Sequence, residues 1–119
     1  MALTIDKAHT ALLAMDFEND IVHEDGAFKA FGFAQMVKQN DVLAKTGRLL
    51  TAARRAGVKV IYVSVKFRPG YPERPQNAGL WQGLVQANAL VEGTWGATIH
   101  SAVAPKEGEP VVSKRGVSA

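Results

Sequence analysis

The sequence predicts an α/β fold built around a parallel sheet, and three consecutive segments support this prediction. Residues 10–15 (TALLAM) form a short apolar run without alternation, as expected for a strand that is buried on both faces. Residues 40–57 then follow a helical period, and residues 58–67 (VKVIYVSVKF) are rich in β-branched side chains. A strand, a helix and a second strand form a βαβ unit, in which the strands are parallel and the crossover is right-handed.

The helix of this unit has both of its ends marked in the sequence. Its apolar residues recur on one face, namely Val42, Leu43, Leu49, Leu50 and Ala53. Asn40 or Asp41 is suited to cap the N-terminus, and Gly57 supplies the C-terminal stop after two arginines in the last turn. We therefore expect one long helix between the two strands.

The remaining segments carry weaker signals. Residues 20–40 contain glycines and phenylalanines and are predicted to form a loop or lid with a poorly defined start of a helix. Residues 67–79 are a loop rich in proline and glycine, residues 81–93 hold a short helix, and residues 93–109 are turn-rich. Residues 110–114 (PVVSK) read as a third strand that is entered through a proline.

Composition places the 119 residues in a single globular domain, with 47% hydrophobic and 21% charged residues. No apolar run reaches the roughly 18 residues that a membrane span needs. The N-terminus lacks the pattern of a signal peptide, so we expect a cytoplasmic protein. The absence of cysteine excludes disulfides, thiolate metal sites and a thiol nucleophile within these residues.

A net charge of +3 and a pI near 9.4 raise the question of nucleic-acid binding. The basic residues are spread along the chain rather than gathered in one stripe. A modest, scattered excess of this kind is typical of a solvated surface, so no nucleic-acid partner is predicted.

Charged residues stand where the predicted strands end. Asp16 follows the first strand directly, Lys66 and Arg68 follow the second, and Lys114 ends the third. The carboxyl ends of parallel strands share one rim, where chemistry gathers, so Asp16 and Lys114 are expected at the ends of neighbouring strands in one cleft. A buried carboxylate is costly without a partner, and the lysine ammonium would keep it charged. Taken alone, however, a strand-ending Asp is more often a cap or turn residue, and a strand-end lysine is commonplace.

Other candidate sites are weaker. Glu18 and Asp20 are expected to face solvent or to cap the following turn. His9, His23 and His100 lack the spacing of metal ligands, and residues 93–97 (GTWGA) do not form a dinucleotide-binding GxGxxG motif. The sequence therefore predicts neither a metal nor a cofactor. The aromatic residues could wall a pocket, although core or interface packing is the commoner use for most of them.

Taken together, these motifs have a family resemblance. LLAMDFEND resembles the first-strand motif of the isochorismatase-like (cysteine hydrolase) superfamily, in which the strand is followed by Asp, an apolar residue, Gln, Asn and Asp; here Glu18 stands in place of the Gln. Residues 57–67 resemble the second strand, and residues 93–119 resemble the Thr-Trp-Gly segment and the third-strand lysine motif. The order and spacing agree over nearly the whole chain.

The resemblance implies a three-layer α/β sandwich with a parallel sheet, of which residues 1–119 would be the N-terminal portion of one hydrolase domain. Asp16 would match the acid that takes the proton of the nucleophile, and Lys114 the lysine that orders the site electrostatically. Phe67, Arg68 and Trp95 are expected to contact the substrate. The family's cysteine would come on a later strand and attack a small amide or carbamoyl substrate through an acyl-enzyme; isochorismatases proper instead use the Asp as a general acid on a vinyl ether.

Some features depart from the family pattern and leave alternatives open. No Asp/His cluster follows the second strand, which favours a metal-free member. Three strands and one long helix leave sheet edges and one face uncovered, so we expect the C-terminal half of the domain as a partner and a homo-oligomer as the assembly. A member without activity, which binds a small molecule or serves as a subunit, and a fragment without a function of its own are the alternatives.

Overall fold

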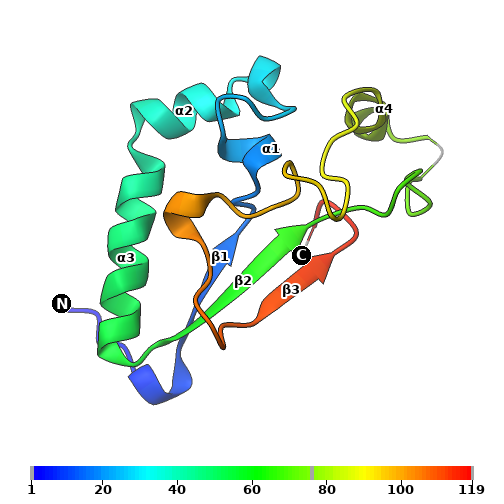
Figure 1. Ribbon diagram of the computed structural model, residues 1–119. Coiled ribbons are helices and arrows are strands. Elements are labelled where there is room, and N and C mark those ends of the chain that lie inside the picture. The colour runs from blue at the N-terminus through cyan, green and yellow to red at the C-terminus, as the bar shows by residue number, and fades with distance from the viewer. Residues whose placement is uncertain (1, 76, 119) are drawn as a thin grey trace.

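Three parallel strands form the centre of the computed structural model, which describes residues 2–75 and 77–118 (Figure 1). These are β1 (Ala11–Met15), β2 (Lys59–Val65) and β3 (Val111–Lys114), in the order β1-β2-β3. The predicted α/β class and parallel sheet are confirmed. The expectation that Asp16 and Lys114 follow neighbouring strands is wrong, because β2 lies between β1 and β3.

Helix α3 (Val42–Ala56) is the predicted crossover between β1 and β2, and it covers one face of the sheet. Its Leu50 packs with Ala14, Val60 and Tyr62 of the strands in one buried cluster. Gly57 ends the helix in the left-handed region, with φ 76°, as predicted. The N-terminus differs, because Asp41 stands at the cap position but its side chain accepts no capping hydrogen bond.

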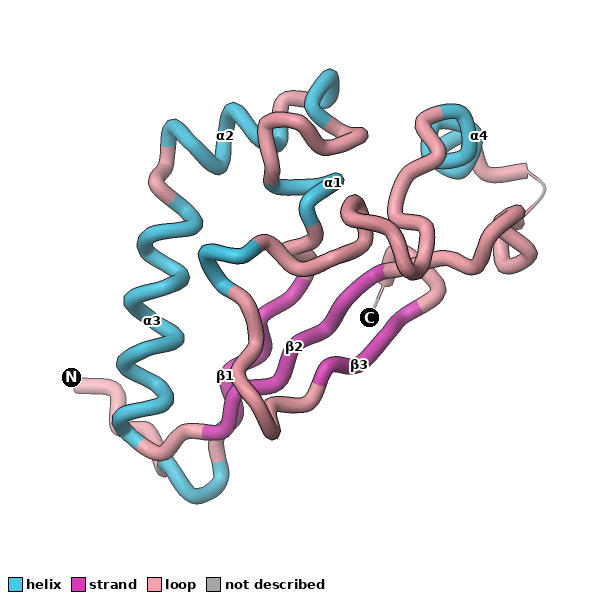
Figure 2. The backbone as a smooth tube through the Cα atoms, in the orientation of Figure 1, coloured by secondary structure: helices cyan, strands magenta, loops and turns pink. Residues whose placement is uncertain are grey.

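The other helices lie beyond the carboxyl ends of the strands (Figures 1 and 2). They are α1 (Asn19–Val22), α2 (Phe33–Gln39) and α4 (Gly79–Gln86). There are also three short 3₁₀ turns, η1 (Lys7–His9), η2 (Lys29–Phe31) and η3 (Ser101–Val103), of which η1 lies before β1 at the amino end of the sheet. The region 20–40 is thus more helical than predicted. A second apolar cluster forms at this end, where Phe67 and Tyr71 pack with Trp81 and Leu84 of α4.

The second face of the sheet is open in the described part of the chain. Leu13 of β1 and Val112 of β3 are 51% and 52% exposed, and Ile61 and Val63 of β2 are only partly buried. The uncovered face agrees with the expectation that further layers complete this sandwich. None of the helices in the described residues is both long and apolar enough to cross a bilayer.

Candidate active site

Asp16 is placed by an unusual backbone conformation at the end of β1. Its N–H continues the ladder by donating to Val63 O at 3.1 Å, but its φ of 63° lies in the left-handed region. This region costs an ordinary L-residue roughly 1–2 kcal/mol, and Asp and Asn enter it more readily than other non-glycine residues. Such local strain is concentrated at functional sites.

Lys114 faces Asp16 across the end of β2. Its Nζ lies 3.2 Å from Asp16 Oδ1 and donates to Val117 O at 2.6 Å. The Lys114 side chain is 10% exposed and that of Asp16 is 41% exposed, so the lysine is the more buried partner. In the described structure only Ala14 of β1 is buried, so the expectation of a strand buried on both faces is wrong. The ammonium offsets the cost of holding a partly shielded carboxylate at the end of this strand.

The ion pair forms one wall of a cavity of about 370 Å³ whose other walls are almost entirely apolar. Those walls include Phe28, Phe31, Phe33, Phe67, Leu84 and Leu90. A cavity with a few charged groups in an apolar lining is the usual form of a small-molecule site.

The structure brings only one of the three expected substrate contacts to this cavity. Phe67 is in the wall. Its N–H donates to Leu90 O and its carbonyl accepts from Glu92 N, both at 2.8 Å. Arg68 instead donates from Nε to Glu73 Oε1 at 2.6 Å. Trp95 packs edge-on against His23, with ring centroids 4.9 Å apart. Neither Arg68 nor Trp95 lines the cavity, and substrate contact by any of the three remains a prediction.

Glu18 does not face solvent, and the expectation from sequence is wrong. Its side chain is fully buried, Oε1 accepts the N–H of Val65 at 2.5 Å, and its backbone pairs with Ile99 in an antiparallel bridge. Burial raises the pKa of this carboxyl above its ordinary value. The residue that differs from the family motif is therefore inside the protein, directly beside the site.

Asp20 is also buried, and its carboxylate joins three segments. Oδ1 accepts from Ala27 N at 2.9 Å and Oδ2 from Leu90 N at 2.7 Å, while its own N–H donates to Gly96 O at 2.9 Å. Gly96 has to be glycine, because a Cβ there would overlap the Asp20 carboxylate. Asp20 thus holds Leu90 in the wall of the cavity. This role was not predicted from the sequence. The apolar residues Ile21 and Val22, which follow Asp20, were the available signal that it is buried.

Residues 10–119 match the family model of the isochorismatase domain. The chain belongs to the isochorismatase family. Two curated relatives, both named ureidoacrylate amidohydrolase RutB, come from Rhizobium rhizogenes and Stutzerimonas stutzeri. Each is 27% identical over 94% of this chain and 50% of its own length.

The structural comparison agrees with this isochorismatase assignment. A cysteine hydrolase from Pseudomonas syringae pv. phaseolicola 1448A has a TM-score of 0.73 and 24% identity, over 96% of this chain and 50% of the other. This similarity confirms the isochorismatase-like α/β fold. The chain spans about half the length of the relatives that it matches.

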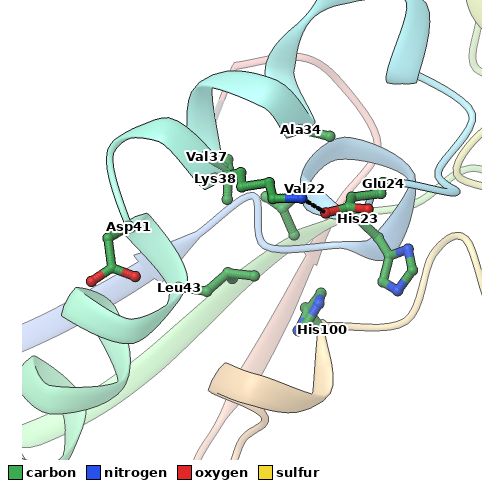
Figure 3. Close-up of a pocket in the computed structure, with 9 residues that line it drawn as sticks. All are labelled: Val22, His23, Glu24, Ala34, Val37, Lys38, Asp41, Leu43 and His100. Atoms are coloured by element: carbon green, nitrogen blue, oxygen red, sulfur yellow. Dashed lines mark ion pairs between the residues drawn. The ribbon is translucent and has the colours of Figure 1, made fainter.

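This isochorismatase-family chain has a second cavity, of about 320 Å³, between α1, α2 and η3 (Figure 3). His23 and His100 lie there with ring centroids 5.3 Å apart, and Lys38 pairs with Glu24 at 3.0 Å. Each histidine Nδ1 accepts a backbone N–H, from Asp25 and Ala102 respectively, at 3.0 Å. In a neutral ring this arrangement places the proton on Nε2, which does not suit metal ligation. Burial also lowers the pKa of His100, which favours that neutral ring.

Proposed function

We propose that this chain carries the acid–base residues of a hydrolase acting on a small amide or carbamoyl substrate. The observation that carries the proposal is the Asp16–Lys114 pair in the wall of an otherwise apolar cavity. A carboxylate that lies beside a lysine ammonium, yet is partly accessible, is suited to accept and return a proton. The apolar walls favour a substrate with an apolar body and one polar, scissile group.

In this mechanism the nucleophile has to come from outside these residues, which contain no cysteine. Asp16 would accept the thiol proton, and the thiolate would attack the carbonyl carbon. The C–N bond would then break, with the departing nitrogen taking the proton from Asp16. Water would hydrolyse the acyl-enzyme, with Asp16 accepting its proton and returning it to the thiolate.

Lys114 would act by electrostatics rather than by proton transfer. Its ammonium lies 3.2 Å from Asp16 Oδ1, where it would attract negative charge on the carboxylate and help to orient it. On a vinyl-ether substrate the same carboxyl would act as a general acid, without the cysteine. The substrate class therefore decides which role Asp16 has.

The test is turnover by the purified full-length protein on a panel of small amides, carbamoyl compounds and a vinyl ether. Ureidoacrylate, which appears in the names of the relatives, belongs in the panel. Asp16→Asn keeps a residue that tolerates the left-handed backbone but removes the proton acceptor. Turnover is expected to fall by roughly two to four orders of magnitude, the usual contribution of acid–base catalysis.

Asp41→Asn is the matched control, because Asp41 has the same left-handed backbone, with φ 54°, but borders the second cavity and not the one that holds Asp16. It is expected to keep full activity. Full turnover by Asp16→Asn contradicts the mechanism. The absence of turnover by the wild-type protein on every class supports the alternative, a member that binds a small molecule or serves as a subunit. The N-terminal half-domain boundary, the cytoplasmic location and the homo-oligomer remain predictions.

A further inference from the structure

The two buried acidic residues beside the site are hydrogen-bonded in different ways. Each oxygen of the Asp20 carboxylate accepts a backbone N–H. Glu18 is 0% exposed, and only its Oε1 accepts one, from Val65. Its Oε2 is buried and has no hydrogen-bond partner among the described residues. A charged carboxylate with one oxygen left unpaired in the interior is several kcal/mol less favourable than a paired one.

A hydrogen-bond acceptor for the second oxygen is available on the neighbouring strand. Ser64 directly precedes Val65 on β2, is 0% exposed, and its hydroxyl also lacks a partner in the described structure. A protonated Oε2 would be a donor, and a serine oxygen can accept from it. The hydroxyl lies beside Glu18 without a well-formed hydrogen bond in the present geometry. A proton on Oε2 would therefore give that oxygen an acceptor in Ser64 Oγ and remove an unpaired buried charge.

The charges around Glu18 also favour the neutral form. Burial is the main cause that raises its pKa, and the negative charge of Asp16 acts in the same direction. The N–H groups of Glu18 and Val65 and the Ser64 hydroxyl oppose this rise. The titratable groups on the neighbouring elements are Lys114 on β3, Lys66 after β2, His100 next to Ile99 and Asp20 on α1. Lys114 is paired with Asp16, and the Asp20 carboxylate accepts the N–H groups of Ala27 and Leu90.

We propose that Glu18 is a neutral carboxylic acid at physiological pH and acts as a positioning residue. Oε1 accepts from Val65 N, and Oε2–H donates to Ser64 Oγ. These two hydrogen bonds connect the segment that follows β1 to β2. Because Glu18 is then neutral, it adds no second negative charge to that of Asp16 beside Lys114. The protonation state of Glu18 stands independently of the activity, whereas its benefit to Asp16 rests on the proposed function.

Infrared spectroscopy of the purified protein tests the protonation state directly. We expect the C=O stretch of a protonated carboxylic acid at neutral pH, absent from Glu18→Gln and retained in Glu107→Gln, an exposed control. Ser64→Ala should shift the band, because it removes the hydrogen-bond acceptor, and this shift assigns the band to Glu18 even if Glu18→Gln does not fold. A wild-type spectrum without the band at neutral pH overturns the proposal.

The pH dependence of unfolding is the second measurement. The folded state holds the Glu18 proton more tightly than the unfolded state, whose pKa is near the ordinary value of 4.5. Glu18 therefore contributes its full stabilisation of the folded state below that value, and this contribution is lost as pH rises through the folded pKa. In that range the unfolding equilibrium constant of the wild type should rise by up to about tenfold per pH unit relative to Glu18→Gln. A constant difference between the two proteins across this range contradicts the proposal, whatever their activities.

Discussion

Lys114 Nζ lies 3.2 Å from Asp16 Oδ1 although the two residues belong to strands that do not touch. The ion pair crosses over the end of β2, where Val65 is paired with Lys114 in register. The ion pair therefore connects the ends of the two outer strands across the carboxyl end of the central strand. It also makes the acid dependent on a residue 98 positions later in the chain (114 minus 16).

Lys114→Met is therefore expected to reduce turnover by about ten- to a hundred-fold. Residues that are in contact or in one salt-bridge network show interaction energies of roughly 0.5–3 kcal/mol, and each 1.4 kcal/mol corresponds to a factor of ten. The folded state should persist, because methionine keeps the apolar stem that packs in the wall. Steady-state kinetics with circular dichroism check both statements, and Lys45→Met, on the exposed side of α3, is the control. Unchanged turnover in Lys114→Met would show that Asp16 works without the lysine.

Asp20→Ala is expected to destabilise the fold by about 2–5 kcal/mol. It leaves the buried N–H of Leu90 and the partly buried N–H of Ala27 without acceptors, at roughly 1–3 kcal/mol each. Denaturant unfolding measures the loss, and the exposed Asp25→Ala is the control. Gly96→Ala should be destabilising as well, because its Cβ would overlap the Asp20 carboxylate. The double variant should lose clearly less than the sum of the two single losses, whereas simple addition would argue against this coupling.

Glu109 gives a pH-dependent contribution to stability. Arg54 donates to both of its oxygens, at 2.9 and 2.7 Å, and this pairing holds the pKa of Glu109 below its ordinary value of 4.5. The contribution is present above that value and is lost as pH falls through the lower, folded pKa. Glu109→Gln should lose on the order of 1 kcal/mol at neutral pH, with a difference that disappears in acid. Thermal unfolding at several pH values checks this, and a difference that persists in acid would assign the loss to packing.

Activity of the full-length protein is expected to survive chelator treatment. The described residues hold no group of three or more His, Cys, Asp or Glu side chains that could bind a metal, and the proposed chemistry needs none. Turnover before and after dialysis against a chelator is the measurement. Loss of activity that zinc, iron or manganese restores would show that the complete site contains a metal.

The sequence predicted the parts of this protein that follow local rules. The βαβ unit came from the periodicity of residues 10–67, and the meeting of Asp16 with Lys114 followed because parallel strands present their carboxyl ends at one rim. The position of β3 was not predictable, since nothing in a local pattern says on which side of β2 a third strand adds. Helix α2 is only 7 residues long, too short for a clear period.

The burial of Glu18 and Asp20 was missed for a different reason. An acidic residue after a strand is ordinarily solvated, and only its partners reveal that it is buried. Those partners are Val65 and Leu90, which lie 47 and 70 residues away. A motif of ten residues contains no information about contacts at such separations in the sequence.

These separations also set the order of events during synthesis. At roughly 5–20 residues per second, the ribosome adds Leu90 about 4 to 14 seconds after Asp20. Glu18 lacks the N–H of Val65 until residue 65 has been made, and Asp20 lacks the N–H of Leu90 until residue 90 has been made. In water, acids of this kind are ionised at neutral pH. Their charges stand directly after the apolar run Ala11–Met15, where acidic residues oppose association between nascent chains. The two carboxyl groups that form hydrogen bonds inside the folded protein thus oppose association of its first strand with other chains during synthesis.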